Sequence, residues 1–291
     1  MKCLNQVIKE RYSIYNGDSC EIMNSIPDNS IHYSIFSPPF ADLYVYSNSE
    51  RDMGNCKSKS EFYEHFKFIV KELYRIMMNG RLVSFHCMNL PTSKQKDGFI
   101  GITDFRGELI KTFQDCGFIY HSEVCIWKDP VIAMQRTKAL GLLHKQIKKD
   151  SAMCRQGIPD YLVTMRKPGD NPERVEHTNE TFPVQIWQNY ASPVWMDINP
   201  SDTLQRTSAR DEKDEKHICP LQLDVIRRGI NLWTNENDIV FTPFMGIGSE
   251  VYQALKMNRR GIGIELKESY YKQAVKNCEN AEIDDSLIKI Y

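Results

Sequence analysis

The sequence predicts an α/β protein built on a doubly wound, mostly parallel sheet, and two patterns carry this prediction. Short segments rich in β-branched and aromatic residues alternate with segments whose apolar residues are spaced three and four apart. Near the C-terminus, the loop Phe244-Met245-Gly246-Ile247-Gly248 joins such a strand to a helix. This alternation is typical of helices that cover both faces of one sheet.

The first half of the chain contains seven of the expected elements. We expect strands at 12–15, 31–36, 81–86 and from Gly117 to Trp127, and helices at 20–26, 59–78 and 104–116. Ser19 is the expected cap of the first helix, and Asn79-Gly80 is expected to end the second. Two prolines directly follow strand 31–36, so a rigid loop stands at the end of that strand.

The α/β pattern weakens between residues 128 and 216 and then resumes. Polar residues, Pro and Asn increase within this stretch, and 201–216 is highly charged. Helices are expected again at 220–233, 249–257 and 269–277, and strands at 239–241 and 261–264. We therefore divide the chain into 1–127 and 217–291, which share the α/β domain, and an inserted region, 128–216.

Composition excludes several classes of protein. The chain has 291 residues, of which 41% are hydrophobic and 26% charged, so it is neither disordered nor fibrous. No apolar run reaches the ~18 residues of a membrane helix, and no signal peptide is recognisable, so we expect a cytoplasmic protein. The nine cysteines contain no CxxC pair, so we expect reduced thiols and no metal site. The net charge of -1 by itself indicates no nucleic-acid partner.

The glycine loop has the organisation of a nucleotide-binding βαβ unit. Glycines let the backbone approach a ligand, and the following helix offers free N–H groups. Glu265 ends the next expected strand, 17 residues after Gly248, where an acid can accept both hydroxyls of a ribose. The third glycine of the dinucleotide fingerprint is missing, which disfavours an oxidoreductase. A purely structural strand–helix turn remains the alternative.

Ser37-Pro38-Pro39-Phe40 is the second motif. The prolines fix the direction of nearby carbonyl groups, so a serine oxygen and a carbonyl can together accept hydrogen bonds from an amino group. Phe40 offers an aromatic face for a planar ring. Taken alone, the motif is equally consistent with a tight structural loop.

Together these motifs resemble those of the β-class DNA amino-methyltransferases, which depend on S-adenosylmethionine (AdoMet). SIFSPPF, FMGIGSE and GIELKESYY follow one another in the order typical of that family. The resemblance covers about 1–128 and 216–291 and implies a class I methyltransferase fold with a permuted motif order. It makes 1–127 the catalytic half, 128–216 the target-recognition region and 217–291 the AdoMet-binding half.

The resemblance also implies roles for individual residues. The exocyclic amine of a flipped base would donate hydrogen bonds to Ser37 and to the Pro38 carbonyl, and would stack on Phe40 beside Pro39. Glu265 would hold the ribose, and Asp18 would approach the adenine unless it is only a turn residue. The other expected AdoMet contacts are Thr242, Phe244, Met245, Gly246, Gly248, Ser249 and His217. Thr242 and Glu250 depart from the family pattern, in which Asp and Thr are usual.

A basic stretch within the recognition region is the expected DNA contact. From Lys128 to Lys167 there are nine Lys or Arg against three Asp or Glu. The residues that we expect at DNA are Lys138, Lys145, Lys148, Lys149, Arg155, Arg166 and Lys167, although a merely solvated face is the alternative. The serine of the proline motif favours cytosine N4 over adenine N6 as the methylated atom. An RNA methyltransferase and a decayed AdoMet-binding module remain alternatives, and a homodimer remains open.

Overall fold

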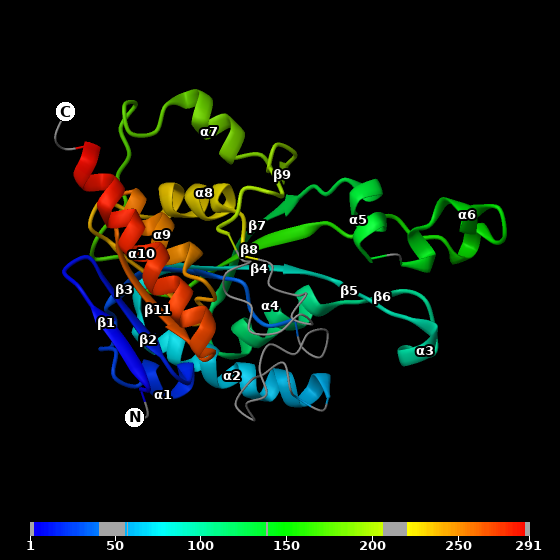
Figure 1. Cartoon of the computed structure of the whole chain (residues 1–291), viewed down its shortest axis with the longest axis horizontal. Helices are drawn as coiled ribbons and strands as arrows, with labels where there is room; N and C mark the ends of the chain where they lie inside the picture. The colour runs from blue at the N-terminus through cyan, green and yellow to red at the C-terminus, as the bar shows by residue number, and fades with distance from the viewer. Residues whose placement is uncertain (1–2, 41–55, 57, 138, 206–219, 289–291) are drawn as a thin grey trace.

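A nine-stranded sheet forms the centre of the part of the chain that the structure describes (Figure 1). This computed structural model describes residues 3–40, 56, 58–137, 139–205 and 220–288. The strand order is β1-β2-β11-β10-β3-β4-β8-β7-β9. The strands are β1 (Asn5–Ile8), β2 (Tyr12–Asn16), β3 (Ile31–Phe36), β4 (Met77–Met88), β7 (Ile119–Ile126), β8 (Asp160–Arg166), β9 (Val194–Trp195), β10 (Ile239–Thr242) and β11 (Arg260–Glu265).

The two ends of the chain share this sheet. Strands β2, β11, β10, β3 and β4 are parallel neighbours, whereas β8 runs antiparallel to both β4 and β7. The register pairs Phe241 with Ser34 and Gly263 with Ile14, so the N-terminal and C-terminal segments alternate across the sheet. The predicted α/β fold with a mostly parallel sheet is therefore confirmed.

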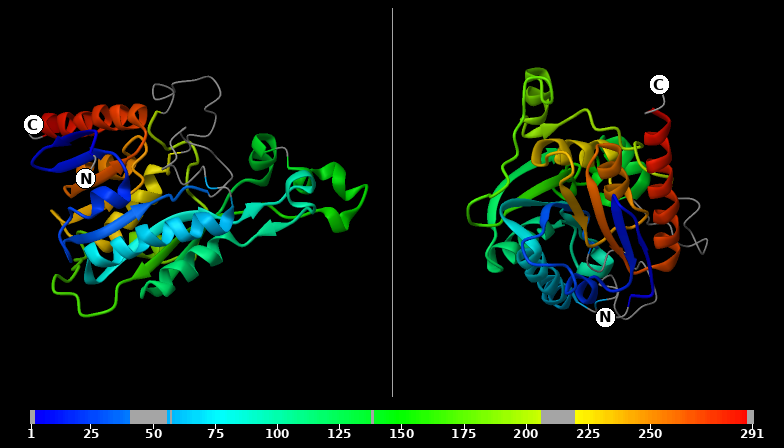
Figure 2. Two further views of the ribbon diagram at one scale, coloured as in Figure 1. Left: turned by 90° about the horizontal axis from the view of Figure 1, so that it is seen from below. Right: turned by 90° about the vertical axis from the view of Figure 1, so that its left-hand side faces the viewer.

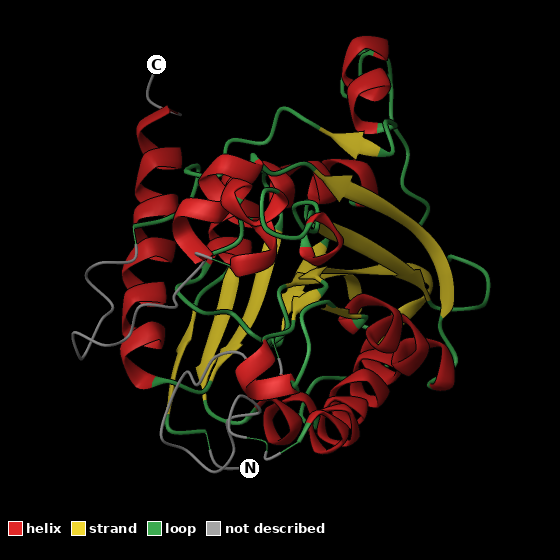
Figure 3. Ribbon diagram, turned by 90° about the vertical axis from the view of Figure 1, so that its right-hand side faces the viewer, coloured by secondary structure: helices red, strands yellow, loops and turns green. Residues whose placement is uncertain are grey.

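Helices cover both faces of the sheet (Figure 3). On one face lie α1 (Ser19–Met23), α2 (Lys59–Ile76) and α4 (Phe105–Asp115), around a core of aromatic rings in which Phe85 stacks on Phe113 at 5.0 Å. On the other lie α8 (Leu223–Trp233), α9 (Ser249–Lys256) and α10 (Glu268–Ile288). Smaller elements are α3 (Lys94–Asp97), α5 (Pro130–Thr137), α6 (His144–Ile147), α7 (Val184–Tyr190) and a short hairpin of β5 (Leu90–Pro91) and β6 (Ile102–Thr103).

The end of helix α2 differs from the prediction. The helix ends at Ile76, and β4 begins at the next residue, so Asn79-Gly80 lies inside a strand and does not end the helix. Gly80 has a φ of +72°, and a Cβ on it would lie 2.7 Å from the backbone nitrogen of Asn171. The glycine is therefore required by a close backbone approach within the sheet. The last helix was predicted at 269–277 but extends to Ile288.

The region 128–216 is not a separate unit throughout its length. Strand β8 lies within it and pairs with β4 and β7 in the central sheet. By contrast, α5, α6 and the chain between them project beyond the ends of β4 and β7, beside α3 and the β5–β6 hairpin (Figures 1 and 2). No helix of the described residues has the length and apolar character needed to span a membrane.

Candidate active site at the carboxyl edge of the sheet

The two sequence motifs meet at the edge where the parallel strands end. The proline motif follows β3, the glycine loop follows β10, and Glu265 ends β11. Ligand sites of open α/β sheets form at this carboxyl edge. The loops are in contact, since the ring of Phe36 lies 5.7 Å from that of Phe244, and Ser19 Oγ donates to the carbonyl of Pro243 at 2.5 Å.

Glu265 is held in place by the backbone of its neighbours. Its Oε2 accepts the Gly246 N–H at 2.8 Å, and its Oε1 accepts the Lys267 N–H at 2.8 Å. Gly246 and Gly248 have φ values of +54° and +90°, which L side chains rarely adopt. Gly248 caps α9 without a side-chain hydrogen bond, so the N-terminus of that helix faces this edge with its amide groups.

Asp18, and not Ser19, caps helix α1. Its Oδ1 accepts the Glu21 N–H at 3.3 Å, while Ser19 is the first helical residue. The Gly17 N–H donates to the Glu265 carbonyl at 2.9 Å, so the loop after β2 is tied to the end of β11. The structure thus brings Asp18 and Glu265 to neighbouring loops, as a shared ligand requires.

The remaining predicted cofactor residues line the same edge in different ways. Thr242 and Ser249 are buried, and Thr242 Oγ1 has no hydrogen-bond partner among the described residues. Met245 packs against β11, because a Cβ on Gly263 would lie 2.4 Å from its sulfur. Phe244 forms an apolar wall, stacked on Phe66 at 6.4 Å. His217 lies outside the described residues.

Glu250 is a buried acid beside this site. Only 4% of it is exposed, and its Oε2 has no partner within the described chain. Burial, and next the negative charge of Glu265, raise the pKa of the Glu250 carboxyl to about 8. The carboxyl is therefore mostly neutral at pH 7, so it adds little negative charge beside Glu265.

The raised pKa of Glu250 predicts a pH-dependent stability. Between its ordinary value of 4.5 and about 8, the folded protein binds a proton that the unfolded chain releases. The free energy of unfolding therefore falls as pH rises through this window. We expect Glu250→Gln to match the wild type at pH 4.5 and to exceed its stability by up to about 5 kcal/mol at pH 8. Urea unfolding at both pH values measures this, with the exposed Glu268→Gln as control; equal pH dependence of Glu250→Gln and wild type would contradict the prediction.

The proline motif lies against two residues that the sequence did not single out. Ser37 Oγ lies 3.2 Å from Nδ1 of His86, on β4. The other ring nitrogen, Nε2, lies 3.1 Å from Oδ2 of Asp160, and Asp160 Oδ1 accepts a hydrogen bond from Lys128 Nζ at 2.5 Å. The parallel register pairs Phe36 with Phe85, which explains why the residues that follow them meet. Phe40 is half-buried, edge-on to His86 at 6.5 Å.

The expected DNA-contacting residues separate into two groups. Lys145, Lys148 and Lys149 lie on the projecting segment with Arg155 nearby, whose guanidinium donates to the Gln156 carbonyl at 3.0 Å. Lys148 and Lys149 are exposed. Lys138 lies outside the described residues. This group projects beyond the same carboxyl edge as the proline motif (Figure 2).

The assignment of Lys167 and Arg166 to DNA needs correction. Lys167 is 6% exposed, and its Nζ donates to Asn29 Oδ1 and to the Met77 carbonyl, both at 2.8 Å. Arg166 donates to the Gly169 carbonyl at 3.1 Å. Because β8 is antiparallel to β4, its last residues lie at the amino ends of the parallel strands, away from the site. Both side chains bind backbone there.

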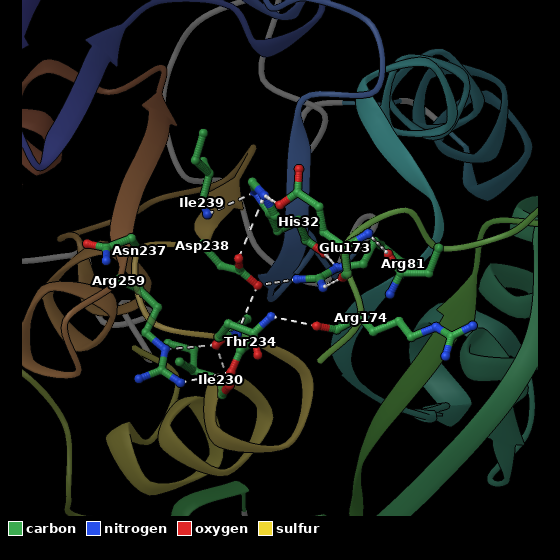
Figure 4. Close-up of polar contacts among 12 residues, drawn as sticks. His32, Arg81, Glu173, Arg174, Ile230, Thr234, Asn237, Asp238, Ile239 and Arg259 are labelled. Carbon is green, nitrogen blue, oxygen red and sulfur yellow. Dashed lines mark hydrogen bonds and ion pairs between the residues drawn. The ribbon is translucent and has the colours of Figure 1, made fainter. Parts of the chain in front are cut away.

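A polar cluster at that opposite edge also escaped sequence reasoning (Figure 4). His32 Nε2 lies 3.0 Å from Glu173 Oε2 and 3.7 Å from Asp238 Oδ1, and buried Arg81 pairs with Asp238. These donors could surround a metal ion. However, His32 Nδ1 accepts the Ile239 N–H at 3.1 Å, so the neutral ring carries its proton on Nε2. A metal at Nε2 would require an imidazolate, so the geometry favours a structural network.

The fold and the meeting of the two motifs define a class I methyltransferase. Over residues 31–276, the chain matches the family model N6_N4_Mtase, described as DNA methylase. The chain therefore belongs to this family of AdoMet-dependent amino-methyltransferases.

Individual proteins show the same likeness at low identity. The chain is 24% identical over 277 residues to the Type II beta methyltransferase M.BslI of Bacillus sp. (strain NEB-606), covering 89% of this chain but only 27% of that protein. It matches PvuII DNA methyltransferase (cytosine-N4-specific) with a TM-score of 0.66 and 16% identity, over 95% and 90% of the two chains. A DNA modification methylase of Thermus thermophilus in complex with AdoMet gives 0.67 and 17%, over 92% and 95%.

Proposed function

We propose that this chain transfers the methyl group of AdoMet to the exocyclic amine of a base flipped out of DNA, with cytosine N4 as the favoured atom. The observation that carries the proposal is the meeting of Ser37-Pro38-Pro39-Phe40 with the glycine loop and Glu265 at one edge of the sheet. The family supports methylation of an amine, and adenine N6 remains the alternative. Ser37 is the residue that favours cytosine.

The site residues suit AdoMet. The uncapped N-terminus of α9 can meet the carboxylate of the methionine part, and the unpartnered Thr242 Oγ1 is a further polar group beside it. Glu265 keeps lone pairs for ribose hydroxyls after accepting its two backbone N–H groups. When bound, AdoMet would supply an electrophilic methyl group on sulfur.

The chain's own contribution is to orient the amine. Ser37 and the Pro38 carbonyl accept its N–H groups, and Phe40 holds the ring plane of the base. Fixing the nitrogen in line with the methyl carbon contributes up to about 7–11 kcal/mol to lowering a barrier. The unpaired base costs a few kcal/mol to flip, which DNA contacts must offset.

A methylation assay tests this function. We would incubate the protein with AdoMet and unmethylated genomic DNA, digest the DNA to nucleosides and analyse them by mass spectrometry. N4-methyldeoxycytidine is the expected product, and N6-methyldeoxyadenosine would overturn the choice of base. AdoMet binding without any product would support the decayed module that Thr242 and Glu250 suggest, and methylated RNA would identify an RNA enzyme.

Glu265 is expected to control AdoMet affinity. Glu265→Gln loses the negative charge and one of two acceptor oxygens, so we expect AdoMet to bind about 10–100-fold more weakly. Isothermal titration calorimetry measures this, with Glu268→Gln on the first turn of α10 as a control of equal charge change. Unchanged affinity in Glu265→Gln would remove Glu265 from the cofactor site.

We propose the projecting segment 128–159, rather than all of 128–216, as the main DNA-contacting region. The triple variant Lys145→Gln, Lys148→Gln, Lys149→Gln is expected to lower the slope of log K against log salt by about three, because each phosphate contact contributes about 0.9. Fluorescence anisotropy with a labelled duplex measures it. A control triple variant of exposed lysines elsewhere, at Lys9, Lys111 and Lys276, should keep the wild-type slope.

A further inference from the structure

We propose that His86 and Asp160 form a proton relay behind Ser37, which turns the serine oxygen toward the target amine as an acceptor and receives the proton that the amine releases. This inference rests on the proposed function of the same site. His86 and Asp160 are positioning residues in this scheme, since they act through Ser37.

The relay is a continuous line of side chains on or beside three strands. Ser37 Oγ lies 3.2 Å from His86 Nδ1, and His86 Nε2 lies 3.1 Å from Asp160 Oδ2. His86 is 8% exposed and Asp160 only 3%. The charged groups that the structure places against this line are Asp160 on β8 and Lys128 after β7, whose Nζ donates to Asp160 Oδ1. The Ser37 hydroxyl follows β3, and Phe40 covers His86 edge-on.

The chemistry of the line fixes the direction of each proton. Burial by itself would raise the pKa of Asp160, but the positive charge of protonated His86 and of Lys128 outweighs burial and lowers it below its usual range. Asp160 is therefore an acceptor only, and it selects the His86 tautomer with the proton on Nε2. His86 Nδ1 is then an acceptor, so the Ser37 hydroxyl donates to it. Both lone pairs of Ser37 Oγ remain available for the N–H groups of the amine.

The same line can remove a proton after transfer. The amine nitrogen forms its bond to the methyl carbon with its lone pair and carries a positive charge, while the carbon–sulfur pair leaves with sulfur. One N–H bond then breaks, and its electron pair stays on nitrogen. The proton passes to Ser37 Oγ as the serine proton passes to His86 Nδ1, and Asp160 stabilises the imidazolium that results. Solvent takes the extra proton before the next turnover.

The serine–histidine–aspartate line is not suited to acyl transfer. A serine nucleophile needs backbone N–H groups for the oxyanion, usually from the residue that follows it. Here that residue is Pro38, and the next is Pro39, so neither has an N–H group. The arrangement therefore supports an acceptor role for Ser37 and not a nucleophilic one.

His86→Asn is the main test, because the asparagine oxygen can still accept the Ser37 proton but cannot become a cation. We expect the single-turnover methylation rate on unmethylated genomic DNA to fall about 10²-fold, with unchanged AdoMet affinity and unfolding midpoint. The wild-type rate should fall on acidification as His86 is protonated, and this acid limb should be absent in the variant. His121→Asn, an exposed histidine at the opposite end of the sheet, should behave as wild type.

Histidine nitrogen NMR tests the relay without methylation. In the wild type we expect the Nε2–H tautomer of His86, and in Asp160→Asn the Nδ1–H tautomer, because the amide can donate to Nε2. A wild-type Nδ1–H tautomer would overturn the relay, as would a His86→Asn variant with the wild-type rate and pH profile. If wild type methylates no nucleic acid, the proposed function fails, while the tautomer still decides whether the relay exists.

Discussion

Ser37→Ala is expected to slow methyl transfer about 10²–10³-fold while AdoMet affinity stays unchanged. The variant removes the only side-chain oxygen of the proline motif, so the amine loses an acceptor that positions it in the transition state. Losses of this size follow removal of one preorganised hydrogen-bonding group from an active site. Single-turnover incorporation of labelled methyl groups into unmethylated genomic DNA measures the rate, and calorimetry measures the affinity for AdoMet.

Ser34→Ala is the matched control on the same strand. Ser34 is fully buried, and its Oγ donates to the Phe241 carbonyl at 3.0 Å, so the control removes a serine hydroxyl with a purely structural contact. We expect Ser34→Ala to lower the free energy of unfolding by about 1 kcal/mol and to keep the methylation rate. Equal rates in Ser37→Ala and wild type would exclude Ser37 from the reaction.

The parts of the site that the sequence predicted are those that local residues determine. Gly246 and Gly248 mark a strand–helix loop because few other residues accept their φ values, and Pro38 and Pro39 end β3 wherever they stand. Glu265 could be placed because its strand was recognisable and the carboxyl ends of parallel strands meet at one edge. Each of these predictions needed the order of neighbouring elements and no contact between distant parts of the chain.

The parts that the sequence missed depend on strand β8. Its residues 160–166 lie in a stretch of weak periodicity, and nothing local shows that they enter the sheet between β4 and β7. That placement brings Asp160 to His86 at the active edge, and it carries Lys167 to the opposite edge, where burial excludes DNA. His86 ends a predicted strand, so its position beside Ser37 could have been found from the parallel register, but Asp160 could not.

Arg81→Met is expected to lower the free energy of unfolding by about 3–5 kcal/mol, because removing one partner of a buried ion pair leaves the other charge uncompensated. Arg81 is 2% exposed, donates to the His32 carbonyl at 2.9 Å and the Glu173 carbonyl at 2.8 Å, and pairs with Asp238, which is 5% exposed (Figure 4). Urea unfolding measures the loss. Arg227→Met, whose pair with Asp224 is on the surface of α8, should cost less than about 1 kcal/mol.

A double-mutant cycle separates the ion pair from the other contacts of Arg81. Asp238→Asn removes the charge that Arg81→Met would leave buried, so the double variant should lose less stability than the sum of the single variants. The residual loss then reports the two carbonyls that Arg81 binds, on β3 and on the chain after β8. Additive losses would mean that Asp238 is already neutralised by His32 or solvent, and that Arg81 joins these segments only through their backbone.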